Sequence, residues 1–296
     1  MIVHRSRFLI HGEVWFDEEP EKNPSVDRIL YYRRSQPVPG AKWSYTYTSA
    51  IDLNRSVEQL KAQLNTDTAY KIRRACERDK IKCECCYPTD PEVRKQFEEM
   101  YNSFASLKGL QPLERERVAN MVAAGRLDFS VAKDPAGNVL VYHGNYRGPH
   151  RATSLYTVSL YRAVSDGALR SLISRANRCL VWSNLLRYKA QGLKCFDFGG
   201  WHTGTDPARL KINQFKQGFG GEIIREYECE RIDSLRGWAV LAVAGLLKWA
   251  KGIPAKLRSN SPTAQLGSAS TLTEGRPPNS SPVVVTPTLG VTELAK

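Results

Sequence analysis

Runs of aromatic and β-branched residues dominate the first 52 residues, and proline and glycine separate them. Such runs are typical of β-strands, because branched and aromatic side chains pack well on a pleated surface. The sequence predicts strands over 7–16, 28–33 and 43–48. Ser56 then begins a helix as its N-cap, with Gln59 completing a capping box. The apolar stripe continues through residue 75, and we expect a break in the helix near Asn65.

From residue 80 onward, the apolar positions alternate between the two-residue period of strands and the longer period of helices. Predicted strands lie at 81–87, 127–133, 139–146, 153–161, 193–198 and 222–231. Predicted helices lie at 90–107, 113–124, 167–190 and 206–217. This β-α-α-β-β-β-α-β-α-β order predicts an α/β (α+β) fold with a mixed central sheet flanked by helices, beside a β-rich N-terminal region.

The segment from Gly237 to Leu247 is apolar on nearly every side, and four basic residues follow it by residue 258. It is too short to span a bilayer comfortably, so a buried or docking helix and a membrane-surface helix both stay open. The residues after it are rich in Ser, Thr, Pro and Gly and are predicted to be disordered. The predicted units are a β-rich companion region at 1–80, a catalytic domain at 81–232, a helix at 233–258 and a tail at 259–296.

Composition adds a strong positive charge to this pattern. The chain has 42% hydrophobic and 25% charged residues, which suits a globular core, and its net charge is +13. The charges in 259–296 cancel, so the whole surplus lies in the predicted folded part. Such a field attracts nucleic acid, anionic lipid or phosphorylated substrates, but it also occurs on merely soluble basic surfaces.

The seven cysteines cannot all pair, and no secretory signal opens the chain, so we expect a cytoplasmic protein. Cys76, Cys83, Cys85 and Cys86 form the one cluster, with spacings unlike those of zinc modules. We therefore predict strand cysteines that are buried or half-buried, and no metal.

The densest unusual stretch joins an apolar strand to glycine pairs. Asp197 stands between two phenylalanines, and Gly199–Gly200 follow it; Gly220–Gly221 form a second pair. Glycine pairs at strand ends permit close approach of a ligand to the backbone. A buried carboxylate needs a partner or a raised pKa. Asp197 is therefore either a cap for loop amides or a group that orients a substrate or a catalytic neighbour.

The segments 182–192, FDFGG at 196–200 and FKQGFGG at 215–221 resemble the FemAB branch of the GNAT-fold acyltransferases, and 51–53 and 70–75 are similar as well. That branch comprises peptidoglycan bridge-forming aminoacyltransferases and N-acyltransferases. The resemblance implies transfer of an acyl or aminoacyl group to an amine, without a covalent enzyme intermediate. The donor is acyl-CoA, another acyl carrier or aminoacyl-tRNA. It would lie where strands 153–161 and 193–198 splay apart and expose backbone N–H groups.

The chain departs from acetyl-CoA-using members, because the glycine-rich turn before the long helix is missing. Arg175 and Arg178 lie in that region and are candidates for donor phosphates, or are solvated helix arginines. Lys216 is the first candidate for a phosphate or a substrate carboxylate.

Four residues are candidates for the catalytic base: Asp197, His143, Glu222 and His202. His143 alternates with core residues, so a hydrogen-bonded core histidine is the competing interpretation. The competing interpretation for His202 is a surface residue without a catalytic role. For Glu222 it is a carboxylate that orders the glycine loop.

We expect an anionic or membrane-attached amine acceptor, such as a cell-wall or surface-polysaccharide precursor, with peripheral membrane contact through 237–258 at the inner face. Transfer RNA is expected only as a donor, and no DNA is expected. Two alternatives remain. A basic nucleic-acid-binding protein would use the run 31–34 as an exposed aromatic and basic surface, and a catalytically inactive GNAT-fold adaptor would bind without turnover.

Overall fold

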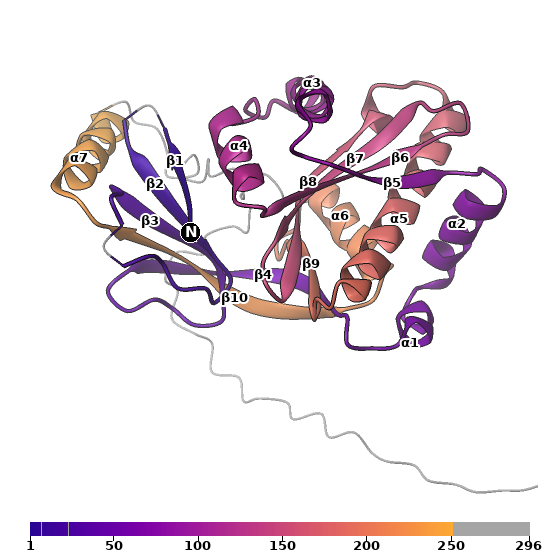
Figure 1. Cartoon of the computed structure of the whole chain (residues 1–296), viewed down its shortest axis with the longest axis horizontal. Coiled ribbons are helices and arrows are strands. Elements are labelled where there is room, and N and C mark those ends of the chain that lie inside the picture. The colour runs from indigo at the N-terminus through magenta and orange to yellow at the C-terminus, as the bar shows by residue number, and fades with distance from the viewer. Residues whose placement is uncertain (7, 23, 251–296) are drawn as a thin grey trace, which may run out of the picture.

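A computed structural model describes residues 1–6, 8–22 and 24–250 of the chain (Figure 1). The predicted tail at 259–296 lies outside these residues, as does the end of the segment 233–258. The described strands form one mixed sheet in the order β1-β2-β3-β10-β4-β9-β8-β7-β6-β5. The predicted fold class, a mixed central sheet flanked by helices, is confirmed.

The strands are β1 (Ile2–Arg5), β2 (Ile10–Trp15), β3 (Arg28–Arg34), β4 (Lys42–Asp52), β5 (Lys82–Cys86), β6 (Leu127–Lys133), β7 (Val139–Arg147), β8 (Arg151–Ser159), β9 (Cys195–Gly200) and β10 (Glu222–Ile232). The helices are α1 (Val57–Ala62), α2 (Thr66–Glu77), α3 (Pro91–Lys108), α4 (Arg115–Ala123), α5 (Gly167–Ala190), α6 (Pro207–Gln217) and α7 (Leu235–Ala250), with a 3-10 turn η1 (Leu160–Arg162). The predicted element order from 81 to 231 is confirmed.

The N-terminal prediction was wrong in part: the predicted strand over 7–16 corresponds to the shorter β2, and β1, which pairs antiparallel with it, lies before it where no strand was expected. A turn separates them, and Ser6 closes it: its backbone N–H donates to the Leu9 carbonyl, 2.9 Å away. The predicted helix break near Asn65 is confirmed, since the Asn65 side chain accepts the Thr68 N–H at 2.8 Å and caps α2.

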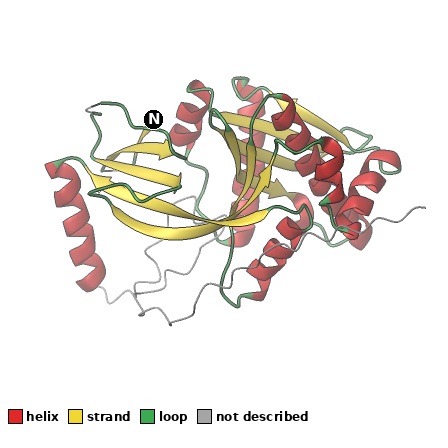
Figure 2. Cartoon of the chain, turned by 90° about the horizontal axis from the view of Figure 1, so that it is seen from below, coloured by secondary structure: helices red, strands yellow, loops and turns green. Residues whose placement is uncertain are grey.

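Helices cover both faces of the sheet (Figure 2). Helices α3 and α4 pack on the face that carries Phe129 and Tyr156, and the Phe97 ring stacks on Phe129 at 4.4 Å. Helices α1, α2, α5 and α6 pack on the other face, around residues such as Phe196 and Phe198 of β9. Because side chains alternate along a strand, Asp197 points away from these two phenylalanines.

Strand β10 lies between β3 and β4, in the middle of the sheet. The last strand of the predicted catalytic unit therefore pairs with strands of the N-terminal region on both sides. Regions 1–80 and 81–232 share one sheet, and the predicted domain boundaries stay predictions.

Helix α7 stands at one end of the molecule, beside β1–β3 (Figure 1). The Ser234 hydroxyl donates to Asp27 at 2.7 Å, and the Arg236 guanidinium donates to the Phe8 carbonyl at 2.9 Å. Much of the apolar surface of α7 is exposed to solvent: the exposed fraction is 61% for Trp238 and 65% for Leu246. Within residues 1–6, 8–22 and 24–250, no helix combines the length and apolarity needed to cross a membrane.

Candidate active site

Strands β8 and β9 run parallel but stay paired only at their first residues. The register joins Arg151 to Cys195, Ala152 to Phe196 and Thr153 to Asp197, after which β8 continues to Ser159 and leaves β9. This is the divergence that the sequence resemblance places between 153–161 and 193–198.

Gly199 stands just beyond the last paired position, with a φ of +74°. A Cβ at this position would lie 3.3 Å from the Ser154 carbonyl oxygen, so both conformation and space favour glycine.

The Asp197 carboxylate lies fully buried at the last paired position. It accepts hydrogen bonds from the Thr48 hydroxyl, from the Gly199 N–H at 2.7 Å and from the Arg151 guanidinium at 2.7 Å. Burial alone would raise the pKa of Asp197, but the charges of Arg151 and Arg33 lower it to about 2. Asp197 is therefore ionised, and both of its oxygens accept hydrogen bonds. One of the donors is a loop amide, the N–H of Gly199.

Arg151 joins Asp197 to a second buried carboxylate, Glu226 of β10, through an ion pair with each. Only 3% of Glu226 is exposed, and its Oε2 atom has no hydrogen-bond partner in the described chain. Burial, followed by the negative charge of Asp197, raises the pKa of Glu226 to about 7. A carboxyl group with such a pKa exchanges a proton readily near neutral pH.

Arg33 of β3 lies on the other side of the cluster and is buried as well, with 4% of its surface exposed. Its Nε atom lies 4.0 Å from Asp197 Oδ2, and its Nη1 atom is buried without a partner among the described residues. The φ of Arg33 is +60°, which is uncommon for a residue with a side chain. Such strain is frequent at functional sites.

Sequence reasoning missed Glu226 and assigned Arg33 to an exposed aromatic and basic run. That assignment was wrong, because Tyr31, Tyr32 and Arg33 are all buried. The missed signal is a charged residue at a buried position of a strand: Glu226 is buried between two residues that are exposed or partly exposed, and Arg33 follows two buried tyrosines.

Lys216 approaches the same turn from α6. Its ammonium donates to the carbonyl oxygens of Gly199, at 3.2 Å, and Gly200. Burial lowers its pKa to about 8. Lys216 thus holds the glycine pair to α6, and its role toward a phosphate or a carboxylate stays a prediction.

His202 follows this turn and is buried as well. Its backbone N–H donates to Asn213 at 3.2 Å, and its Nε2 atom accepts the Asp206 N–H at 3.3 Å.

The other predicted base candidates lie apart from this cluster. His143 is buried between β7 and α5, where its ring nitrogens bond to Asn177 at 2.8 Å and to Asn184 at 3.2 Å. Burial lowers the pKa of His143 to about 4, so the ring is neutral. The Glu222 side chain is 78% exposed and lies 3.6 Å from Arg55.

The predicted phosphate contacts already have partners inside the chain. Arg175 forms an ion pair with Asp79 at 2.5 Å, and Arg178 lies 5.0 Å from the centre of the Phe215 ring.

The second glycine pair, Gly220–Gly221, forms the turn between α6 and β10 and has positive φ at both residues. A Cβ on Gly221 would lie 2.6 Å from the Ala50 carbonyl oxygen, so this pair serves close packing within the chain.

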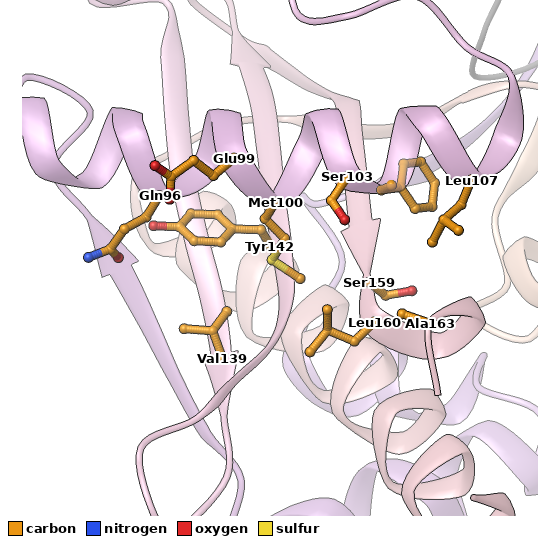
Figure 3. Close-up of a pocket in the computed structure, with 11 residues that line it drawn as sticks. Gln96, Glu99, Met100, Ser103, Leu107, Val139, Tyr142, Ser159, Leu160 and Ala163 are labelled. Atoms are coloured by element: carbon orange, nitrogen blue, oxygen red, sulfur yellow. The ribbon is translucent and has the colours of Figure 1, made fainter. Parts of the chain in front are cut away.

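A groove of about 400 Å³ lies between α3 and the far end of β8 (Figure 3). Side chains of Met100, Phe104 and Tyr142 line it, together with Ser159 and Leu160 at the end of β8. Most of the lining is apolar, and it includes Ser159, the last residue of β8, the strand that leaves β9.

Within the described ranges, no group of three or more His, Cys, Asp or Glu side chains is placed to hold a metal ion. The seven cysteines are free thiols. Cys76 and Cys85 are exposed, whereas Cys83 and Cys86 are half-buried, so the cysteine prediction was wrong for two of the four. Cys76, near the end of α2, places its Sγ 3.3 Å from that of Cys179 in α5.

No protein-family model matches the chain, and no curated protein matches its sequence. Among solved structures the chain is similar to FemX, with 15% identity and a TM-score of 0.49 over 63% of this chain and 61% of FemX. It is also similar to L-PGS from Bacillus licheniformis, with 12% identity and a TM-score of 0.46 over 73% and 72% of the two chains.

A tandem GNAT protein from the clavulanic acid biosynthesis pathway is similar at 15% identity, with a TM-score of 0.36 over 69% of this chain and 64% of that one. The chain spans less than two thirds of the length of FemX. Its proposed chemistry therefore rests on the site geometry.

Proposed function

We propose that this chain transfers an acyl or aminoacyl group from an activated carrier to an amine. The observation that carries the proposal is the splay of β8 from β9, which begins at the buried Asp197–Arg151–Glu226 cluster. Strands that separate leave backbone N–H groups without strand partners, and such groups can bind a carbonyl oxygen and the negative charge that develops on it.

In the proposed reaction the acceptor nitrogen attacks the donor carbonyl carbon. A C–N bond forms, the bond from carbon to the carrier sulfur or oxygen breaks, and the carrier leaves with a proton. Glu226 accepts the proton that the amine loses and passes it to the departing carrier, since its free Oε2 and its pKa of about 7 suit a general base that also acts as an acid. Asp197 and Arg151 act as positioning residues that hold Glu226 in place.

The donor is an acyl-CoA, another acyl carrier or an aminoacyl-tRNA. The apolar groove beside Ser159 favours a donor with a hydrocarbon acyl group, because burial of such a group there removes apolar surface from water. The acceptor amine belongs to an anionic or membrane-attached molecule, such as a cell-wall or surface-polysaccharide precursor. The net charge of +13 and the exposed apolar residues of α7 support this choice.

Mass spectrometry of the full chain, incubated with amine acceptors and a panel of donors, tests the reaction. The panel contains acyl-CoA thioesters from acetyl to myristoyl and a mixture of charged tRNAs. We expect protein-dependent consumption of one donor class and formation of the matching amide. Glu226→Gln should lower the rate about 100-fold, which is the usual contribution of a general base.

Glu222→Gln is the matched control, because it changes an exposed carboxylate on the same strand. Its rate should stay within about twofold of the wild type. Consumption of no donor by the wild type would refute the proposed function. Equal rates for Glu226→Gln and the wild type would refute the role of Glu226. Unchanged transfer by a folded Asp197→Asn variant would make Asp197 purely structural.

A further inference from the structure

A second cavity, of about 620 Å³, lies between α7, α4 and strands β1–β3, away from the splay. The apolar side chains of Val240, Leu241 and Ala244 form its wall on α7. The facing wall is mixed: it has polar groups such as Glu13 and Arg28 beside the apolar side chains of Phe8, Leu9 and Leu30. The α7 wall is therefore apolar, whereas the facing wall combines polar and apolar groups.

The polar groups of the facing wall form a closed hydrogen-bond network. Glu13 accepts from His4 Nε2 at 2.9 Å, from Trp15 Nε1 at 3.2 Å, and from the Nε and Nη2 atoms of Arg117 at 2.5 and 3.0 Å. Burial would raise the pKa of Glu13, but Arg117 lowers it to about 2.

His11 accepts from Arg28 Nε at 2.9 Å, and burial, followed by the charge of Arg28, lowers its pKa to about 4. The hydrogen-bond partners of these groups lie outside α7.

Helix α7 does not close the cavity. Glu13, Arg117 and His11 are already buried and have hydrogen-bond partners outside α7, so contact with α7 would give them no new hydrogen bonds. The stripe formed by Val240, Leu241 and Ala244 stays half-buried across an open space. A molecule with one apolar and one polar part would satisfy both walls.

We propose that this cavity binds an anionic phospholipid, with one hydrocarbon chain beneath α7 and the phosphate toward Arg5 and Arg28. The proposal rests on the membrane contact of α7 suggested under the proposed function, and it does not depend on the transfer reaction. In this arrangement the outer face of α7, with Trp238 and Leu246, lies in the membrane surface.

Charge supports an anionic lipid. Among the lining arginines, Arg28, Arg115 and Arg117 pair with Glu230, Glu98 and Glu13, whereas Arg5 is exposed and has no ion pair in the described part of the chain. Between Ser234 and Asn260 the sequence contains five basic residues and no acidic residue. Basic residues beside a membrane-surface helix attract anionic headgroups. The volume also lies within the range of about 300–1,000 Å³ that is usual for ligand pockets.

The test uses the full chain and lysophosphatidylglycerol below its micelle concentration, with binding measured by isothermal titration calorimetry. Ala244→Phe fills the cavity from the α7 side and should weaken binding at least tenfold. Ala242→Phe makes the same change on the exposed face of α7 and should leave the affinity within twofold. Leu241→Ser makes the apolar wall polar without filling the space, so it replaces Ala244→Phe if that variant does not fold.

Co-sedimentation with vesicles separates the cavity from the outer face. Vesicles of phosphatidylcholine with one quarter phosphatidylglycerol should bind the wild type, and pure phosphatidylcholine should not. Equal lysophosphatidylglycerol affinity in wild type and Ala244→Phe would overturn the proposal, as would equal affinity for lysophosphatidylcholine. Because none of these measurements requires turnover, they can fail while acyl transfer succeeds, and the reverse.

Discussion

The sheet contains two pairs of parallel neighbours, β2–β3 and β8–β9, and they end differently. The first stays paired from His11–Arg28 to Trp15–Tyr32, whereas the second separates after Thr153–Asp197. A buried acid lies at each pair, Glu13 in the first and Asp197 in the second.

The two acidic clusters also differ in how completely their polar atoms are hydrogen-bonded. Each oxygen of Glu13 has a partner, and both are bonded to Arg117. At the splay, Glu226 Oε2 and Arg33 Nη1 have no partner in the part of the chain that the structure describes. A saturated network costs little to keep and fixes the fold, whereas unpaired buried groups are expensive unless a ligand or a reaction uses them. This difference supports a structural role for the Glu13 cluster and our proposal that the Asp197 cluster takes part in the reaction.

The largest effect should come from breaking the saturated cluster. Glu13→Ala leaves Arg117 buried without its carboxylate, so the free energy of unfolding should fall by about 3–5 kcal/mol. Chemical denaturation, monitored by circular dichroism, measures this fall in the free energy of unfolding. Glu230→Ala is the control, because its ion pair with Arg28 is partly exposed and should contribute at most about 1 kcal/mol. A loss below about 1 kcal/mol for Glu13→Ala would contradict the structural role.

A smaller effect should appear in the pH dependence of stability. The folded protein holds the Glu226 proton more tightly than the unfolded chain, since burial raises the pKa from 4.5 to about 7. The stabilisation from this group is complete below about pH 4.5 and is lost as the pH rises through 7, by about 3 kcal/mol. Glu226→Gln should therefore gain stability relative to the wild type over this interval.

Unfolding free energies of both proteins at pH 4.5, 6 and 8 measure this difference. The comparison is needed because His11 and His143, whose pKa values are lowered to about 4, change stability in the opposite direction as the pH falls below 6.5. A constant difference between the two proteins at all three pH values would show that Glu226 is not held protonated by burial.

The smallest effect should come from the groove. Met100→Trp reduces the space beside Leu160, so the ratio of myristoyl to acetyl transfer should fall about tenfold, equivalent to about 1.4 kcal/mol. Lys95→Trp, on the exposed side of α3, should leave the ratio unchanged. An unchanged ratio in Met100→Trp would place the acyl group elsewhere and leave the assignment of the splay intact.

Local patterns in the sequence were sufficient for most of the fold. Strand alternation at Leu127, Phe129 and Val131, and caps such as Asn65 and Asp90, act over a few residues, so they can be recognised without tertiary information. The burial of Asp197 and the special conformation of Gly199 follow from the same local logic. The N-terminal turn at Ser6 escaped prediction because no glycine or proline marks it.

What only the tertiary structure decided is which distant groups meet. Strand β10 enters the middle of the sheet and brings Glu226 to Arg151, 75 positions away in the chain. Arg33 reaches Asp197 through the same strand order. Burial and neighbouring charge set the pKa of each group, and both depend on contacts across the whole sheet. The sequence by itself thus determined the strands, helices and turns, while strand order determined which residues form the site.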